Sequence, residues 1–202
     1  MTNKLLYALA LGFFGAVIVH ICILFLVPYH GQYNTWLRLQ SRIPLFGFHQ
    51  LAADDPIART ADPLFKLRAC IFTLADAPEA DTLPGDNTPA FNGNEPVHIS
   101  ASGKVPFWSM SVYDSAGTKL YSLNSLSTAD KGLDIIIGTP LQIMDLKQVT
   151  ADSANNSILV PQAIDNGTVL LRVFAPSKDW QPKIDAFLQN ARCSPVVLED
   201  AL

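Results

Sequence analysis

The stretch Pro106-Phe107-Trp108-Ser109-Met110-Ser111-Val112-Tyr113-Asp114 decides the fold of this chain. Every second residue from Trp108 to Val112 is apolar, namely Trp108, Met110 and Val112. In a strand, successive side chains point to opposite faces, so these three share one face. The stretch therefore predicts a core strand with one fully apolar face. The other face mixes aromatic and small polar side chains, which suit recognition, so we expect it to meet a partner. This predicted partner face consists of Phe107, Ser109, Ser111 and Tyr113.

Turn residues and short apolar runs surround this strand. Asp114-Ser115-Ala116-Gly117 predicts a hairpin, because Gly117 can adopt the positive φ of a tight turn. No helical pattern separates the runs, which favours a sandwich or barrel over alternating strands and helices. We expect a mainly β, antiparallel fold with further strands at residues 66–74, 96–101, 118–123, 133–137, 141–149, 157–160 and 168–174.

A long loop interrupts this β region, and a helix closes it. Residues 76–95 hold three prolines, two glycines and five acids, so no regular element is expected there. Near the other end, Ser177 or Asp179 can cap a helix and Pro182 suits its first turn. The apolar stripe of this C-terminal helix, which we assign to core packing, consists of Trp180, Ile184, Phe187, Leu188 and Ala191.

The chain begins with a segment that can cross a membrane. Residues 5–27 contain no Asp, Glu, Lys or Arg, and a helix of this length covers the hydrocarbon core of about 30 Å. A cleaved signal peptide is the alternative, but its apolar region is shorter and ends in small residues, which Leu26-Val27-Pro28-Tyr29 does not supply. We therefore expect residues 1–28 to be a transmembrane anchor of the inner membrane.

The next segment, residues 29–61, is expected to lie at the membrane surface and then to form a linker. Its aromatic and basic side chains are typical of the headgroup level, and they recur at helical spacing before Pro44. An unstructured tether is the alternative. The predicted interfacial anchors are Tyr29, Tyr33, Trp36, Arg38 and Arg42, and the folded domain is expected at residues 62–202.

Charge separates the two parts of the chain. Residues 51–202 hold 11 basic and 18 acidic residues, a formal charge of −7. Nucleic acids and anionic membrane surfaces bind concentrated Lys and Arg, so we expect no nucleic-acid partner and contact with lipid through the anchor alone.

No familiar catalytic or metal-binding set is present. The G-x-S-x-G motif is absent, and His98 is the single histidine beyond residue 50. Ser102 and Lys104 are a weak candidate for a serine-lysine pair, because they lie in a predicted turn. Neither Cys-x-x-Cys nor His-x-x-x-His occurs, and the acids of the 76–95 loop lack the order of a calcium loop. We therefore expect no catalytic, cofactor or metal residues.

The two cysteines of the domain are candidates for a disulfide. Cys70 lies in its first predicted strand and Cys193 at the end of its last helix. An oxidising compartment would allow them to pair. Lys4 on one side of the anchor balances Arg38 and Arg42 on the other, so charge does not decide the orientation.

The anchor carries a stripe that favours contact with another helix. Ala8, Gly12, Ala16 and His20 are spaced by four residues and share one helix face. Small residues let helices approach closely, and a histidine within a membrane needs a polar partner. Coincidence is the alternative, since small residues are common in spans.

Several of these segments resemble known bacterial domains of unknown function, the twelve-fifty-four and twelve-fourteen families. The resemblance rests on Asp62 to Cys70, on Val105 to Asp114 with Gly117 and Tyr121-Ser122-Leu123-Asn124, and on Leu170-Leu171-Arg172-Val173-Phe174-Ala175-Pro176. It implies a β-sandwich of jelly-roll type and, for short members, a single-span protein encoded beside a sister of similar build. It brings no established catalytic residues. Together with Cys70 and Cys193, it favours a periplasmic domain.

These observations lead to one functional hypothesis and two alternatives. The first is a non-enzymatic accessory or structural subunit of an envelope complex, which binds other membrane proteins, including a sister domain protein. An envelope hydrolase is the first alternative, and it requires a pocket near His98 or Ser102. A small-ligand-binding domain is the second, and it requires a large apolar cavity.

Overall fold

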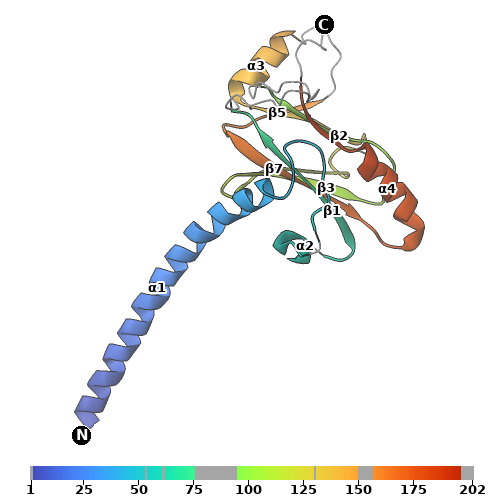
Figure 1. The fold of residues 1–202 in the computed structure, drawn as a ribbon. Coiled ribbons are helices and arrows are strands. Elements are labelled where there is room, and N and C mark those ends of the chain that lie inside the picture. The colour runs from blue at the N-terminus through green and yellow to red at the C-terminus, as the bar shows by residue number, and fades with distance from the viewer. Residues whose placement is uncertain are drawn as a thin grey trace.

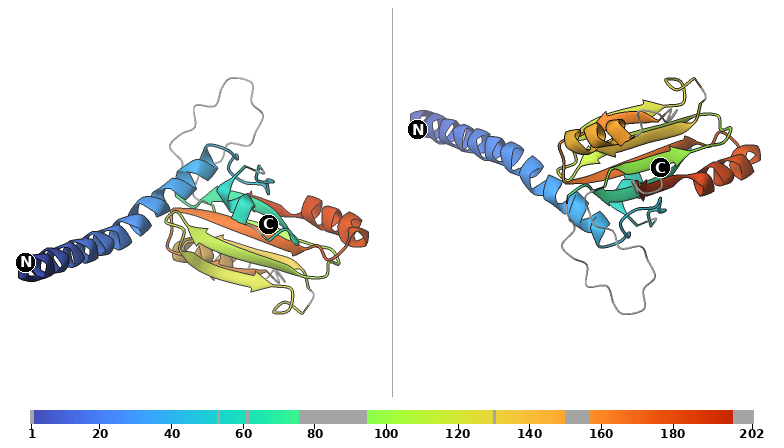
Figure 2. Two further views of the ribbon diagram at one scale, coloured as in Figure 1. Left: turned by 90° about the horizontal axis from the view of Figure 1, so that it is seen from below. Right: turned by 90° about the horizontal axis from the view of Figure 1, so that it is seen from above.

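The structure is a computed structural model, in which a long helix leads into a β domain (Figure 1). It describes residues 2–52, 54–60, 62–75, 95–129, 131–149 and 157–196, with the backbone alone for residues 2–3 and 28–38. The predicted loop at 76–95 therefore lies, except for Glu95, outside the described residues. Figure 2 shows the two layers of the domain and the helix leaving from one side.

Two four-stranded sheets form the domain. Sheet A has the order β1 (Phe65–Thr73), β7 (Asn166–Phe174), β3 (Trp108–Asp114) and β4 (Lys119–Asn124), and all its pairs are antiparallel. Sheet B has the order β6 (Ile158–Pro161), β5 (Leu133–Gly138), β2 (Val97–Ala101) and β8 (Arg192–Pro195). Its pairs are antiparallel except β5 with β6. The predicted mainly β fold with two packed sheets is confirmed.

The inner faces of the two sheets make one hydrophobic core. Trp108, Met110 and Val112 of β3 are all at most 3% exposed, as their alternation predicted. They join Phe72 of β1 and Ile135 of β5 in the same cluster. The predicted hairpin after β3 also forms, since Gly117 has φ +83° and its N–H donates to the carbonyl of Asp114 at 3.1 Å.

One predicted strand is a helix. Residues 141–149 belong to α3 (Pro140–Val149), which follows β5 and leads toward the parallel strand β6. Thr139 and Gln142 form a capping box, in which the N–H of Thr139 donates to Oε1 of Gln142 at 2.7 Å. Ile143 and Leu146 pack on Ile136. The buried side chains of this segment are therefore three residues apart, as in a helix, and not two apart, as in the strand that the sequence predicted.

The C-terminal region contains the predicted helix and one strand that we did not predict. A short 3-10 helix (Lys178–Trp180) precedes α4 (Gln181–Asn190), and the predicted apolar stripe packs into the core through Ile184 and Phe187. Ser177 precedes the 3-10 helix without a side-chain capping bond. Cys193 lies in β8 and not at the end of the helix, because the chain pairs with β2 after Asn190.

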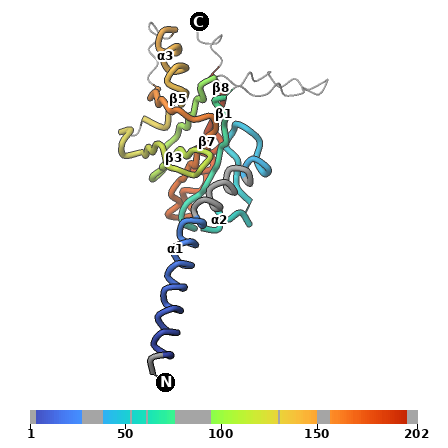
Figure 3. Tube along the Cα trace, turned by 90° about the vertical axis from the view of Figure 1, so that its left-hand side faces the viewer, coloured from blue at the N-terminus to red at the C-terminus, as the bar shows by residue number. Residues whose placement is uncertain are grey.

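The N-terminal helix is longer than the predicted anchor. α1 (Thr2–Gln40) continues through Pro28, so the anchor and the predicted surface helix are one element. Figure 3 shows that the end of α1 meets the domain. In its last turn, Leu39 is 2% exposed and packs with Ile43, Leu51 and Ile71. The folded unit therefore begins before the predicted boundary at Asp62, and part of the predicted linker covers sheet A.

Candidate interaction surface

The predicted partner face lies on the outer side of sheet A, in rows that run across three strands. Ser109 stands beside Arg172 of β7, Ser111 beside Leu170 and Tyr113 beside Thr168. On the far side of β7, Leu67 of β1 is paired with Arg172. Ser111 is 9% exposed, whereas Phe107, Ser109 and Tyr113 are half-buried, so this face is only partly covered by its own domain.

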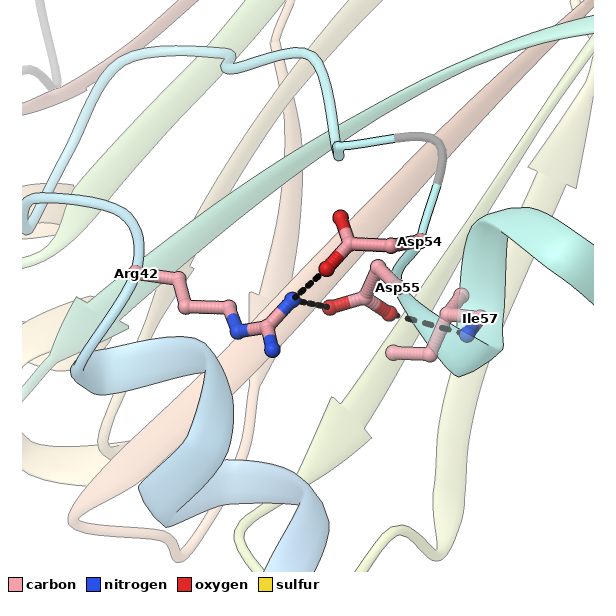
Figure 4. Close-up of polar contacts among 4 residues, drawn as sticks. All are labelled: Arg42, Asp54, Asp55 and Ile57. Atoms are coloured by element: carbon pink, nitrogen blue, oxygen red, sulfur yellow. Dashed lines mark hydrogen bonds and ion pairs between the residues drawn. The ribbon is translucent and has the colours of Figure 1, made fainter.

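The end of α1 and α2 (Pro56–Thr60) cover the part of this face that β1 contributes. Asp55 starts α2, and its Oδ1 accepts the N–H of Ile57 at 2.8 Å. Nη1 of Arg42 lies 3.6 Å from carboxylate oxygens of both Asp54 and Asp55 (Figure 4). Arg42, predicted as an interfacial anchor, thus pairs within the domain and ties the end of α1 to the start of α2.

A groove remains beside this cover, which we call the sheet A groove. It consists of two adjoining cavities of about 490 and 290 Å³, and Ile57 and Leu170 line both. Phe107 and Ser109 line the larger cavity, and Tyr113 lines the smaller one. Three of the four predicted partner-face residues thus share one groove, and Ser111 lines neither cavity.

Two groups of this groove were not predicted from the sequence. Arg172 comes from β7 and Ile57 from α2, which are more than 100 residues apart. The alternation of side chains in residues 168–174 predicts the sheet face on which Arg172 lies. No signal in the sequence predicts that α2 lies over this face. The groove forms because the chain segment after α1, which includes α2, packs over part of the outer face of sheet A.

The predicted helix-contact stripe lies in the apolar part of α1. Lys4–Val27 is 24 residues long and exposed throughout, and an 18-residue window within it has a mean hydropathy of 2.7. This helix is long and apolar enough to cross a membrane. Ala8, Gly12, Ala16 and His20 are all exposed in the chain, and a Cβ added at Gly12 would meet nothing within 4 Å. The side chains of Tyr29, Tyr33, Trp36 and Arg38 lie outside the described residues.

The candidate cysteine pair lies at the seam between the two sheets. A disulfide joins Cys70 of β1 to Cys193 of β8, with the Cα atoms 6.6 Å apart. Both residues are at most 3% exposed. Cys22 is a free, exposed cysteine within the apolar helix.

His98 belongs to a small polar group on the outer face of sheet B. Its Nε2 lies 2.8 Å from Oδ1 of Asp134, and the hydroxyl of Ser157 donates to the same oxygen at 2.8 Å. A histidine that activates a serine must stand between the serine and the carboxylate. Here the carboxylate stands in the middle, so these contacts describe a hydrogen-bonded group at the surface.

The other candidate for catalysis, Ser102 with Lys104, lies in the turn after β2. A cavity of about 490 Å³ opens there, and Trp108, Ser125 and Lys131 also line it. Both Ser102 and Lys104 are exposed, whereas a lysine that serves as a base needs desolvation. Within the described ranges, no group of three or more His, Cys, Asp or Glu side chains is placed to hold a metal ion.

Comparison with known proteins shows the fold alone. No protein-family model matches the sequence, and no curated protein matches it. The fold is similar to that of the VPA0106 protein from Vibrio parahaemolyticus, with a TM-score of 0.54, 11% identity and coverage of 83% of this chain and 34% of that chain. An uncharacterized protein from Burkholderia cenocepacia is less similar, with a TM-score of 0.45, 15% identity and coverage of 81% and 38%. This chain therefore spans little more than a third of either protein.

Proposed function

We propose that this chain is a single-pass accessory or structural subunit of the inner membrane, with its β domain in the periplasm. It binds partner proteins of an envelope complex through its span and through the sheet A groove. The proposal rests above all on the continuity of α1, which runs from the apolar segment to Leu39, a residue that lines the smaller cavity of the groove. One helix thus fixes both proposed contact surfaces relative to each other.

The exposure of the apolar helix supports membrane insertion. The apolar side chains of Lys4–Val27 are all exposed, which is costly in water, and lipid removes this cost. At a rise of about 1.5 Å per residue, the 13 residues after Val27 extend about 20 Å further. The domain would then stand clear of the bilayer, with its groove open to a neighbouring protein.

The disulfide supports the periplasmic location. Cys70 and Cys193 are bonded, and disulfides persist in oxidising compartments and not in the bacterial cytoplasm. A reporter fused to the C-terminus tests the orientation. We expect activity from a reporter enzyme that works only in the periplasm. Activity of a reporter that works only in the cytoplasm would overturn this part of the proposal.

A family resemblance supports a sister domain protein as one partner. Short members of the twelve-fifty-four and twelve-fourteen families, which this chain resembles, are encoded beside a sister of similar build.

Co-purification from membranes in a gentle detergent tests the proposal. Gly12→Leu should reduce partner recovery several-fold, because a large side chain blocks close helix approach while meeting nothing in the chain itself. Ala10→Leu is the matched control, since Ala10 lies on the opposite side of the helix from Gly12. Equal recovery of all partners by the wild type and the Gly12→Leu variant would contradict the proposed contact.

A further inference from the structure

An arginine lies on the floor of the larger cavity of the sheet A groove, where most neighbours are apolar. Arg172 belongs to β7, a central strand, and stands between Leu67 and Ser109 in register. Two residues away on the same strand face are Leu170 and Phe174. The guanidinium therefore projects from a sheet surface that is otherwise suited to apolar contact.

An aromatic row closes the cavity at one end. The ring of Phe65 lies 6.5 Å from that of Phe107 and 5.4 Å from that of Phe174, measured between centroids. Ile57 and Thr60 of α2 line the side, and Leu170 continues the apolar floor. A volume of about 490 Å³ falls within the range of small-molecule sites, which are mostly apolar with a few polar groups that fix orientation.

Charge in the cavity favours an anion of single charge. Among the described residues, the side chain of Arg172 makes no hydrogen bond or ion pair, whereas its backbone belongs to the ladders with β1 and β3. Asp62 also lines the cavity, but its Oδ1 accepts the N–H of Leu64 at 2.8 Å and holds the turn before β1. One arginine matches one carboxylate, which it can bind through two parallel hydrogen bonds. A doubly charged phosphate would require more positive charge than this cavity offers.

We propose that this cavity binds a small amphipathic carboxylate, of the fatty-acid type, with its head group on Arg172 and its chain against the aromatic row. Ser109 lines the cavity, and its hydroxyl can donate to a remaining lone pair of the head group, whereas the hydroxyl of Thr60 donates to the carbonyl of Pro56 at 3.0 Å. The apolar chain gains by leaving water, and the carboxylate replaces its hydration with the guanidinium. This site lies within the sheet A groove that we propose as a partner surface, and binding of the carboxylate itself needs no protein partner.

The test uses the full chain in nanodiscs of phosphatidylcholine and two probes that have the same alkyl chain, one with a charged and one with a neutral head group. Octanoate is compared with octanamide by saturation-transfer NMR, with empty nanodiscs as the blank. Octanoate should bind saturably, and octanamide should bind roughly tenfold more weakly or not at all, since a hydrogen bond to a charged group is worth more than a neutral one. Equal binding of the two probes would overturn the role of Arg172.

Two variants and a control locate the site. Arg172→Gln should weaken octanoate binding roughly tenfold and leave octanamide unchanged, because it removes the charge. Ser109→Trp should abolish octanoate binding by filling the cavity. Arg192→Gln is the matched control, since Arg192 is an exposed arginine on β8 of sheet B. Octanoate binding that survives Ser109→Trp, or that falls equally in Arg192→Gln, would place the ligand elsewhere and overturn the proposal.

Discussion

Cys70 and Cys193 join the two sheets of the sandwich at one edge, because β1 is an outer strand of sheet A and β8 an outer strand of sheet B. The chain after α1 covers the same seam. The N–H of Gly47 donates to the carbonyl of Cys193 at 2.7 Å, and the N–H of Phe46 donates to that of Ile71 at 2.8 Å. The disulfide and this segment therefore fasten the seam beside the point where the long helix meets the domain.

Loss of the disulfide should destabilise the domain strongly. Cys193→Ala removes a crosslink that closes a separation of 123 residues, and loss of a native disulfide costs about 2–5 kcal/mol. Chemical denaturation of the full chain in mild detergent measures the free energy of unfolding. Cys22→Ala should leave it unchanged, because Cys22 is exposed and free. Intact-mass measurement under non-reducing conditions that found three free thiols in the wild type would contradict this prediction.

Two neighbouring aspartates should differ in their effect on stability. Asp55→Ala removes a side chain that is 2% exposed and leaves the N–H of Ile57 without its acceptor, so we expect a cost of about 1–3 kcal/mol. Asp54→Ala should cost less than about 0.5 kcal/mol, because its side chain is 76% exposed. Urea unfolding of both variants compares them directly. Equal effects would mean that Asp55 does not fix the start of α2.

The contact between α1 and the domain should be sensitive to one leucine. Leu39→Ala empties a site that is 2% exposed, and truncation of a buried leucine costs about 2–5 kcal/mol. It should also expose residues 39–52 to limited proteolysis, because these residues would detach from sheet A. Leu45→Ala, at a leucine that is 41% exposed, is the control and should behave like the wild type. A protease pattern unchanged by Leu39→Ala would show that α1 docks by other contacts.

A glycine of β7 should not tolerate a side chain. A Cβ added at Gly167 would lie 2.3 Å from a ring carbon of Phe72, so Gly167→Ala forces the core ring to move. We expect a cost of about 3 kcal/mol, the upper end for overpacking. Phe72→Leu in the same chain should restore part of this loss, since the smaller side chain leaves room. Additive effects of the two substitutions in thermal unfolding would disprove the clash.

The sequence predicted the elements with strong local patterns and missed those that depend on their surroundings. The alternation around Met110 predicted both the core face and the face of Ser109, because strand side chains have a fixed period. Residues 141–149 were misassigned because a short apolar run fits a strand or a helix, although Thr139, Pro140 and Gln142 carried a helix start signal. β8 was missed because its four residues show no alternation that distinguishes them from the end of a helix.

The groove itself was only half predictable. Phe107, Ser109 and Tyr113 follow from the period of β3, whereas Arg172 and Ile57 reach the same groove through tertiary packing. The predicted linker was misjudged for the same reason. Leu39 and Leu51 stand in stretches of mixed polar and apolar residues, and their burial depends on the outer face of sheet A.

Photo-crosslinking in intact membranes tests the proposed partner surface most directly. A photoreactive phenylalanine derivative replaces Tyr113 in the smaller cavity, and in a second chain it replaces Leu126, which is 82% exposed and lines neither cavity of the groove. We expect a discrete crosslinked product at position 113 that Gly12→Leu diminishes, and no such product at position 126. Absence of a product at position 113, or the same products from both positions, would contradict the claim that this groove binds a partner in the membrane.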